Sequence, residues 1–193
     1  KCIYLFQINL CLMRIFIFYL FFLFCFSMNA FAEYHDIQIK RLDRSDGLSN
    51  SNVLSIEQDS FGFVWIATES GLNRFDGKNF VSYKHNRFQS NSLACNAINK
   101  LLIDKEGCLW IATTHEGLDR YNHETDTFIH YFPTGKKGDI SGPAITDLSL
   151  SYNGNIWVAT YYDGLNLFDK RQNKFTHYRV DENNPNSIRE NII

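Results

Sequence analysis

The chain has 193 residues, of which 45% are hydrophobic, 16% aromatic and 21% charged, and its formal net charge is −2. This supply of apolar side chains is ample for a packed core, and it excludes an intrinsically disordered chain. A nucleic-acid-binding surface needs a basic patch. The sequence has no such cluster, so we expect this chain to bind no nucleic acid.

The first 32 residues have the pattern of an export signal. Met13 and Arg14 form a short positive start, residues 15–26 are all apolar or aromatic, and Ala-Phe-Ala at 30–32 is a cleavage site. The apolar run is short for a membrane-spanning helix, which needs about 20 residues. We therefore predict a signal peptide over residues 1–32 and a periplasmic mature chain.

Two features of this leader have alternative interpretations. Counted from Ile3, the apolar stretch is longer, so an uncleaved membrane anchor is the alternative to a signal peptide. Residues 1–12 are interpreted as an upstream extension, with Met13 as the possible true start. With cleavage after residue 32, Glu33 is the first mature residue.

The mature chain keeps two cysteines, Cys95 and Cys108. Export would place them in an oxidising compartment, where disulfides form. Cys95 precedes one predicted strand and Cys108 begins the next, at the far end of the same hairpin. A disulfide needs Cα atoms within about 7 Å, so we predict that both thiols are free.

The mature chain is organised by a tetrapeptide that occurs three times. It reads Trp-Ile-Ala-Thr at 65–68 and 110–113 and Trp-Val-Ala-Thr at 157–160, with the tryptophans 45 and 47 residues apart. A fixed period of this size indicates a repeat architecture. Each unit contains four short runs rich in β-branched and aromatic residues, separated by Asp, Ser and Gly turns. In the first unit these runs are residues 53–58, 63–68, 71–75 and 80–83.

Four antiparallel strands in about 46 residues form one blade of a β-propeller, so the predicted fold is all-β. A strand at 35–42 precedes the first unit, and such a strand commonly closes a propeller ring by joining the last blade. A ring takes about 4–8 blades, so three blades alone would leave two exposed apolar sheet faces. The predicted boundaries are closing strand 33–47, blade 1 48–92, blade 2 93–139, blade 3 140–187 and the start of blade 4 at 188–193.

The strand that carries each tetrapeptide is predicted to be buried on both faces. In residues 64–67, apolar side chains occupy the odd and the even positions, as a strand between two blades requires. The tryptophans are therefore expected in the core and not on a carbohydrate-binding platform. Val53 and Ile56 of the first strand lie an odd number apart, which indicates a bulge or burial on both faces. The structural positions of the repeat are Trp65, Trp110, Trp157, Gly71, Gly117 and Gly164.

Three stretches of the first unit carry a family resemblance: Asp-Gly-Leu-Ser at 46–49, Asp-Ser-Phe-Gly-Phe-Val-Trp-Ile-Ala-Thr at 59–68 and Gly-Leu-Asn-Arg-Phe-Asp-Gly at 71–77. They resemble the two-component regulator propeller repeat, and the resemblance extends over residues 35–193. That repeat forms the periplasmic sensor region of hybrid two-component histidine kinases in Bacteroides-type bacteria. The resemblance implies a non-catalytic N-terminal part of such a sensor.

The same resemblance implies a parent histidine kinase in the inner membrane. It also implies an oligosaccharide ligand, control of polysaccharide-utilisation genes and a homodimer formed through the full sensor region. Two alternatives stay open: an exported propeller enzyme of the sialidase-like or quinoprotein kind, and a protein-binding propeller scaffold.

Ligand contacts are expected where the repeats differ from one another. The turns after the tetrapeptides and the long connections 84–97, 132–144 and 179–192 should lie at one end of the blades. Variable polar and aromatic loops on a rigid scaffold are common binding sites, although the same residues could be ordinary solvated turns. The candidate ligand-binding residues are Glu69, His115, Glu116, Tyr161, Tyr162 and Asp163.

No catalytic, cofactor or metal site is predicted. His130 and His177 hold equivalent positions, but exposed edge residues are a better interpretation than a metal pair. Residues 104–107 do not have the spacing of a calcium-binding loop. No motif of a serine hydrolase, a zinc protease or a phosphate-binding loop occurs.

Overall fold

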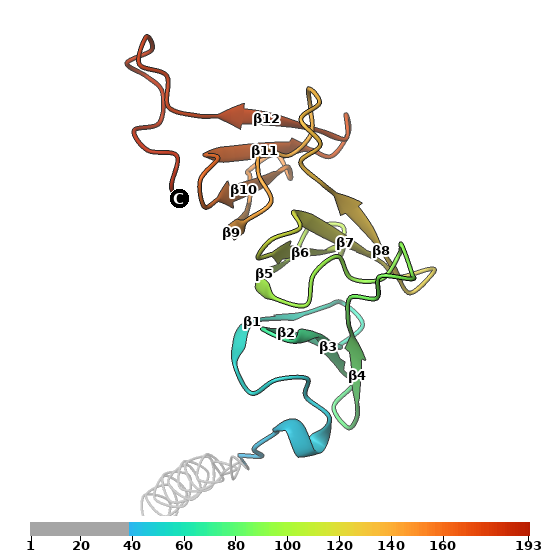
Figure 1. Ribbon diagram of the computed structural model, residues 1–193. Helices are drawn as coiled ribbons and strands as arrows, with labels where there is room; N and C mark the ends of the chain where they lie inside the picture. The colour runs from blue at the N-terminus through green and yellow to red at the C-terminus, as the bar shows by residue number, and fades with distance from the viewer. Residues whose placement is uncertain (1–38) are drawn as a thin grey trace, which may run out of the picture. The chain divides into compact units, whose positions relative to one another are not determined.

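A computed structural model of the chain describes residues 39–193. The predicted signal peptide lies outside these residues. The described part contains three four-stranded antiparallel sheets, and in each of them strands adjacent in sequence pair with one another (Figure 1). This confirms the predicted all-β fold of four-stranded blades. The strands are β1 Val53–Gln58, β2 Val64–Thr68, β3 Gly71–Phe75, β4 Phe80–Tyr83, β5 Ile98–Ile103, β6 Leu109–Thr113, β7 Leu118–Asn122, β8 Thr127–Tyr131, β9 Ile145–Leu150, β10 Ile156–Thr160, β11 Leu165–Asp169 and β12 Lys174–Tyr178.

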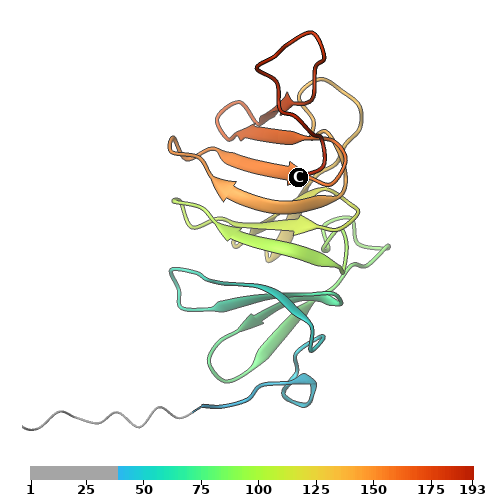
Figure 2. The ribbon, with the colours of Figure 1, turned by 90° about the vertical axis from the view of Figure 1, so that its left-hand side faces the viewer.

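The three sheets stack face to face, as Figure 2 shows. The first strands of successive sheets, β1, β5 and β9, lie next to one another. Bonds between these strands come from side chains: Ser55 Oγ accepts from the Leu101 amide at 3.1 Å, and Asn99 Nδ2 donates to the Ile145 carbonyl at 2.7 Å. The first strand of each blade is therefore the edge along which the blades meet.

The second strand of the middle sheet is buried on both faces, as the sequence predicts. In β6, Leu109 and Ile111 pack in the core between the first and second sheets. Trp110 and Ala112 point the other way and pack between the second and third sheets. Because successive residues of a strand point to opposite faces, β6 contributes side chains to both of these cores.

Each first strand contains a bulge, which confirms the irregularity predicted from its apolar pattern. The register between β1 and β2 shifts between Val53 and Ser55. The equivalent shift occurs in β5, between Ile98 and Lys100, and where β9 pairs with the end of β10. The extra residue turns the side chains that follow it to the opposite face, so both faces of the strand can carry core residues.

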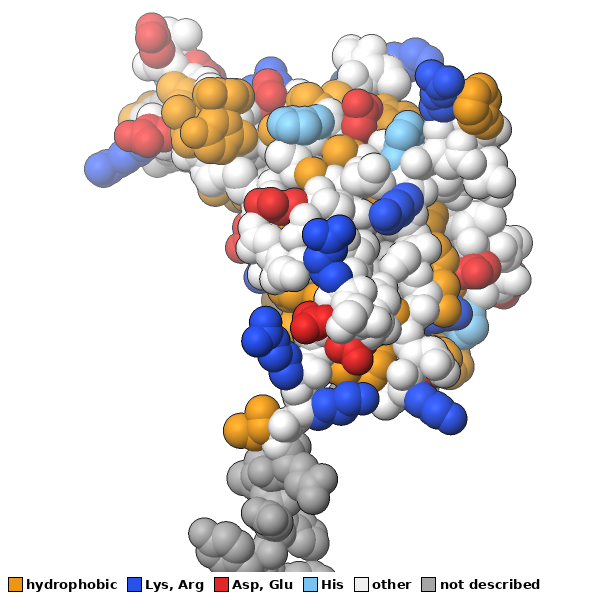
Figure 3. Space-filling model, turned by 60° about the horizontal axis from the view of Figure 1, so that its bottom comes forward, with side chains coloured by type: hydrophobic (Ala, Val, Ile, Leu, Met, Phe, Trp, Pro, Cys, Tyr) orange, Lys and Arg blue, Asp and Glu red, His pale blue; other side chains and the backbone are white. Residues whose placement is uncertain are grey.

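The two end sheets of the described unit each have an uncovered face. Trp65 and Trp110 are 2% and 1% exposed. Trp157 is only half-buried, because no described sheet covers its side of β10. At the other end, four apolar side chains of β1 and β4 are at least one-third exposed, and Figure 3 brings this end forward with apolar side chains visible between charged ones. They are Val53, Leu54, Ile56 and Val81.

The segment before β1 contains one helical turn, η2 (Arg44–Asp46). Asp43 caps it by accepting from the Ser45 amide, and Asp46 accepts from the Asp43 amide in return. Of the strand expected at 35–42, residues 35–38 lie outside the described part and residues 39–42 form no strand. No neighbouring sheet edge among the described residues pairs with them. No helix within residues 39–193 has the length and apolar character needed to cross a membrane.

Candidate functional site

The turn after the second strand is fixed in the same way in all three blades. The threonine that ends each tetrapeptide is fully buried. In the second blade, Thr113 Oγ1 donates to the Gly117 carbonyl at 2.7 Å and accepts from the Glu116 amide at 3.0 Å. Thr68 and Thr160 make the same pair of bonds. The turn residues between threonine and glycine therefore project from a rigid base.

Glycine is required at the end of this turn. Gly117 has φ +82°, and a Cβ there would lie 2.4 Å from the Tyr131 carbonyl oxygen. Gly71 and Gly164 also have positive φ, with Cβ positions 2.7 and 2.4 Å from a carbonyl oxygen of the fourth strand. Only a residue without a side chain lets the third and fourth strands approach so closely.

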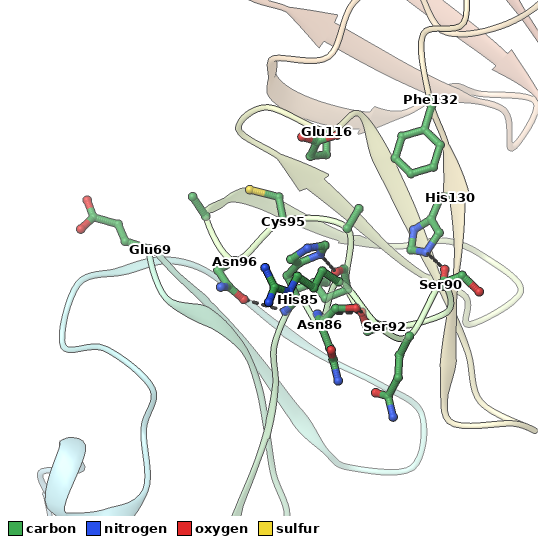
Figure 4. A pocket seen from close by; sticks show the side chains of 15 residues that line it. Glu69, His85, Asn86, Ser90, Ser92, Cys95, Asn96, Glu116, His130 and Phe132 are labelled. Atoms are coloured by element: carbon green, nitrogen blue, oxygen red, sulfur yellow. Dashed lines mark hydrogen bonds between the residues drawn. The ribbon is translucent and has the colours of Figure 1, made fainter.

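Two of these turns meet the first crossover, residues 84–97, at a cleft of about 640 Å³. We call it the first crossover cleft. Glu69 from the β2–β3 turn lies at one end, and Glu116 from the β6–β7 turn lies above the crossover residues (Figure 4). His130 and Phe132, at and just beyond the end of β8, close the opposite side. Side chains from two successive blades therefore line one cavity.

The crossover is held in place by its own hydrogen bonds. The amide of Asn86 donates to Ser92 Oγ at 2.9 Å, and Ser92 Oγ donates back to the Asn86 carbonyl at 3.1 Å. The amide of His85 donates to Asn96 Oδ1 at 2.7 Å. In contrast, the side-chain ends of Gln89 and Glu116 form no hydrogen bond within residues 39–193. The cleft thus combines a fixed backbone with free polar groups.

His130 ties the crossover to the second blade. Its Nδ1 lies 2.6 Å from a carboxylate oxygen of fully buried Asp119, and its Nε2 lies 2.9 Å from the Ser90 carbonyl. The Ser90 carbonyl can only accept, so Nε2 donates to it, and an ionised Asp119 carboxylate accepts from Nδ1 of a protonated imidazolium. The bond to Asp119 raises the pKa of His130, and burial raises the pKa of Asp119. The expectation that His130 is an exposed edge residue is therefore wrong, because the crossover folds back over it.

No described residues form a group of three or more metal-ligating side chains. His177 is exposed, and its Nε2 contacts the Asp139 carbonyl at 2.6 Å. Cys95 and Cys108 are both half-buried and unpaired in the described structure.

Comparison with known proteins identifies the repeats. The family model for the two component regulator propeller matches residues 47–70 and 92–115. Each match runs from the segment before a first strand, through the first two strands, into the turn that follows. These two segments are similar to two-component regulator propeller repeats.

The propeller repeats are shared with sensor proteins. The chain is 40% identical to the extracellular domain of a hybrid two-component system from B. thetaiotaomicron, with a TM-score of 0.68 over 72% of this chain and 20% of that one. It is also 41% identical over 63 residues to histidine kinase P4 of Formosa agariphila, which is 33% of this chain and 5% of the kinase. The chain is therefore a stretch of β-propeller related to two-component sensor domains, and it spans a small part of each relative.

The propeller fold also occurs in a protein of another kind. Virginiamycin B lyase from Staphylococcus aureus superposes with a TM-score of 0.55 over 75% of this chain and 45% of the lyase. The identity is 16%, so this likeness shows the fold alone.

The propeller repeats bring only some of the sequence-predicted ligand residues together. Glu69 and Glu116 line the first crossover cleft, whereas His115 is exposed beside it and does not line it. The third-blade candidates lie elsewhere. Tyr161 and Tyr162 are exposed and pack edge to face, with ring centroids 4.4 Å apart.

Asp163, the last of these candidates, is committed to an ion pair. Its Oδ1 lies 3.1 Å from Arg179 Nη2. Glu69 is also partly occupied, because its carboxylate accepts from Asn52 Nδ2 at 2.6 Å. Glu116 is therefore the candidate acid with the freest carboxylate.

Sequence reasoning missed a buried polar position in the third strand of every repeat. Asn73, Asp119 and Asn166 are fully buried. Each accepts an amide hydrogen from the segment before the first strand; for Asn166 the donor is Ser141, at 2.9 Å. The signal was present in the sequence as an amide or acid at the second or third residue of each predicted third strand. These side chains fix the crossovers against the blades.

Proposed function

We propose that this chain is part of the extracytoplasmic, non-catalytic sensor region of a hybrid two-component histidine kinase. Its likeness to the extracellular domain of such a system, at 40% identity and a TM-score of 0.68, carries the proposal. The partial match to a histidine kinase supports it. In this proposal the chain is exported by its signal peptide to the periplasm, and the parent protein sits in the inner membrane.

The ligand in this proposal is an oligosaccharide bound at the turn-and-crossover end of the blades. The first crossover cleft supports this choice, because Glu116 and Gln89 offer unpaired hydrogen-bonding groups over a fixed backbone. Sugar hydroxyls need such acceptors and donors. Tyr161 and Tyr162 add an exposed aromatic surface in the next blade, which suits contact with the apolar face of a sugar ring.

Signalling would work through differential binding. A ligand that prefers one arrangement of a sensor homodimer shifts the population toward that arrangement. Across the membrane, the kinase would respond with expression of polysaccharide-utilisation genes. The propeller repeats themselves need no catalytic residue for this role.

Calorimetric titration of the full-length protein tests whether the ligand is an oligosaccharide. The probes are oligosaccharides from plant, algal and host polysaccharides. We expect one class to bind, with affinity reduced about tenfold or more in Glu116→Gln, because a charge-assisted hydrogen bond contributes about 1.5–3 kcal/mol. Glu124→Gln, in an exposed turn outside this cleft, is the matched control. Absence of heat with every oligosaccharide would contradict the proposal.

The gene sequence downstream of Ile193 tests whether the parent protein is a histidine kinase. A membrane helix followed by histidine-kinase motifs supports the proposal. A stop codon directly after a closed propeller would instead favour an exported enzyme or a binding scaffold.

A further inference from the structure

The second crossover, residues 132–144, departs from the pattern of the other two. In the first crossover, Asn86 and Ser92 close the loop by two hydrogen bonds between the Ser92 hydroxyl and the Asn86 backbone, at 2.9 and 3.1 Å. In the third, Ser187 closes on the Asp181 backbone with the same two bonds, at 3.0 and 3.1 Å. The first and third crossovers are therefore closed by the same pair of serine hydrogen bonds, which we call the serine closure.

The second crossover replaces the serine closure with a different one. Here Thr134 Oγ1 donates to the Asp139 carboxylate. Between these two residues lie Lys136 and Lys137, flanked by two glycines with φ of +82° and +95°. Positive φ at both flanking positions is accessible to glycine at little cost. The loop is thus closed at its base by its own acid and carries two adjacent lysines at its tip.

This loop lines a cleft of about 660 Å³, which we call the second crossover cleft. Its titratable lining residues are Lys136, Lys137, His177 and Arg179, and no carboxylate lines it. The first crossover cleft, in contrast, is lined by both Glu69 and Glu116. Of these two clefts at equivalent places in successive blades, only the second is lined by cations without a carboxylate, because the first combines its two acids with Arg87 and His130.

The nearby acids form no ion pair with the two lysines. Asp163 is paired with Arg179 at 3.1 Å, and the Asp139 carboxylate is held by Thr134. Neither lysine side chain makes an ion pair or a hydrogen bond within the described residues, and both are exposed. Ser141 and Thr176 add hydroxyl groups to the lining. The Ser141 hydroxyl already donates to the Asp163 carbonyl at 2.9 Å. The free groups are thus two ammonium ions beside the Thr176 hydroxyl, which is the chemistry that binds an anion.

We propose that the second crossover cleft binds an anionic group, a carboxylate, sulfate or phosphate, through Lys136 and Lys137. The size of the cleft accommodates a charged sugar unit as well as a free inorganic anion. This site is separate from the first crossover cleft, so it stands whether or not that cleft binds an oligosaccharide.

Calorimetric titration of the full-length protein distinguishes the sources of the anion. The probes are a galacturonate tetrasaccharide, a sulfated galactose tetrasaccharide, a neutral galactose tetrasaccharide, and inorganic phosphate and sulfate. We expect at least one anionic probe to bind, with affinity that falls as salt is raised from 50 to 300 mM, since exposed charges are screened over about 10 Å at 0.1 M. Binding of a charged saccharide alone assigns the anion to a sugar, and binding of phosphate or sulfate assigns it to a free ion.

The variants test the two lysines directly. Lys136→Ser/Lys137→Ser should weaken the anionic probe about tenfold or more, and Lys136→Arg/Lys137→Arg should retain binding. Lys78→Ser, an exposed lysine in the β3–β4 turn, is the matched control and should bind as the unmodified protein does. Equal thermal unfolding of all variants shows that folding is intact. The proposal is overturned if no anionic probe binds, if the neutral tetrasaccharide binds as tightly, or if the serine variant keeps its affinity.

Discussion

Asp104 accepts a hydrogen bond from the indole of Trp110, with 2.9 Å between Oδ2 and Nε1. Asp59 and Trp65 repeat the bond at 2.8 Å. The other oxygen of each acid accepts two backbone amides of its turn, as Asp104 does from Glu106 and Cys108. One carboxylate therefore closes a tight turn and sets the orientation of the largest core side chain. In the third blade a serine stands at this position, and Trp157 is less buried.

Asp104→Ala should destabilise the protein by about 3 kcal/mol. The acid is 6% exposed and also accepts from Lys170 Nζ at 3.0 Å. Its loss leaves the Trp110 indole and two turn amides without their acceptor, and leaves Lys170 paired with exposed Glu106 alone. Denaturant unfolding monitored by tryptophan fluorescence measures the change. Asp59→Ala, at a half-buried acid with no such cation, should cost about 1–2 kcal/mol. Equal losses in the two variants would contradict the role assigned to burial and Lys170.

The Asp119–His130 pair should make stability depend on pH. The folded state raises the pKa of His130, through the bond to Asp119, and raises the pKa of Asp119, through burial. Both groups then hold protons more tightly in the folded state. The contribution of His130 is fully present below its unfolded pKa, about 6.5, and is lost as pH rises through the folded value, whereas the contribution of Asp119 is fully present only below the unfolded pKa of an aspartate, about 3.9. Denaturant unfolding between pH 6 and pH 9 should show this loss.

The first blade supplies the control for that experiment, because its equivalent pair is neutral: Ser82 Oγ donates to Asn73 Oδ1 at 2.8 Å. Asp119→Asn/His130→Ser copies this pair into the second blade. Between pH 6 and pH 9, the free energy of unfolding should fall less in the double variant than in the unmodified protein. If both proteins have the same pH profile, the pair does not titrate as proposed.

The sequence predicts the backbone of this fold closely, because both of its signals are local. The first strand was expected at 53–58 and is β1 (Val53–Gln58), and the third was expected at 71–75 and is β3 (Gly71–Phe75). Apolar residues at alternate positions specify a strand, and apolar residues at every position specify one buried on both faces. The bulge was visible as a break in that alternation at Val53 and Ile56.

The site was harder to predict, because it depends on which loops fold back on one another. Sequence order places Glu69 and Glu116 on separate blades and gives no reason to pair either with residues 85–97. His130 looked like an edge residue, and only the return of the crossover over it brings Ser90 and Asp119 to its two nitrogens. Unlike the buried amide or acid of every third strand, the His130 bonds are absent from the first repeat, where Ser82 stands, so no pattern common to all repeats marks them.

Gly117→Ala should destabilise the protein by about 2–4 kcal/mol. The new Cβ would lie 2.4 Å from the Tyr131 carbonyl, at a φ of +82°, so it adds a steric clash to a strained conformation. Gly62→Ala is the control, because Gly62 has a similar φ of +89° and nothing lies within 4 Å of its Cβ position. That variant should cost only about 1 kcal/mol. Denaturant unfolding of the two proteins isolates the contribution of the clash, and similar losses would show that the third and fourth strands separate easily.

Thr113→Val should loosen the turn that presents Glu116 to the first crossover cleft. Valine keeps the shape of threonine but removes the bonds to the Gly117 carbonyl and the Glu116 amide. The Glu116 amide then lacks its acceptor, and the Gly117 carbonyl keeps only the backbone amide of residue 113 as a donor. We expect a loss of about 1–3 kcal/mol in global stability and faster hydrogen exchange at the Glu116 amide, measured by mass spectrometry. Thr127→Val, at a half-buried threonine whose hydroxyl contacts only the exposed Thr125 hydroxyl, is the control. Because Glu116 is the freest acid of the cleft, Thr113→Val should also weaken any ligand that Glu116→Gln weakens, and unchanged exchange at the Glu116 amide would show that the strand ends hold this turn without the threonine.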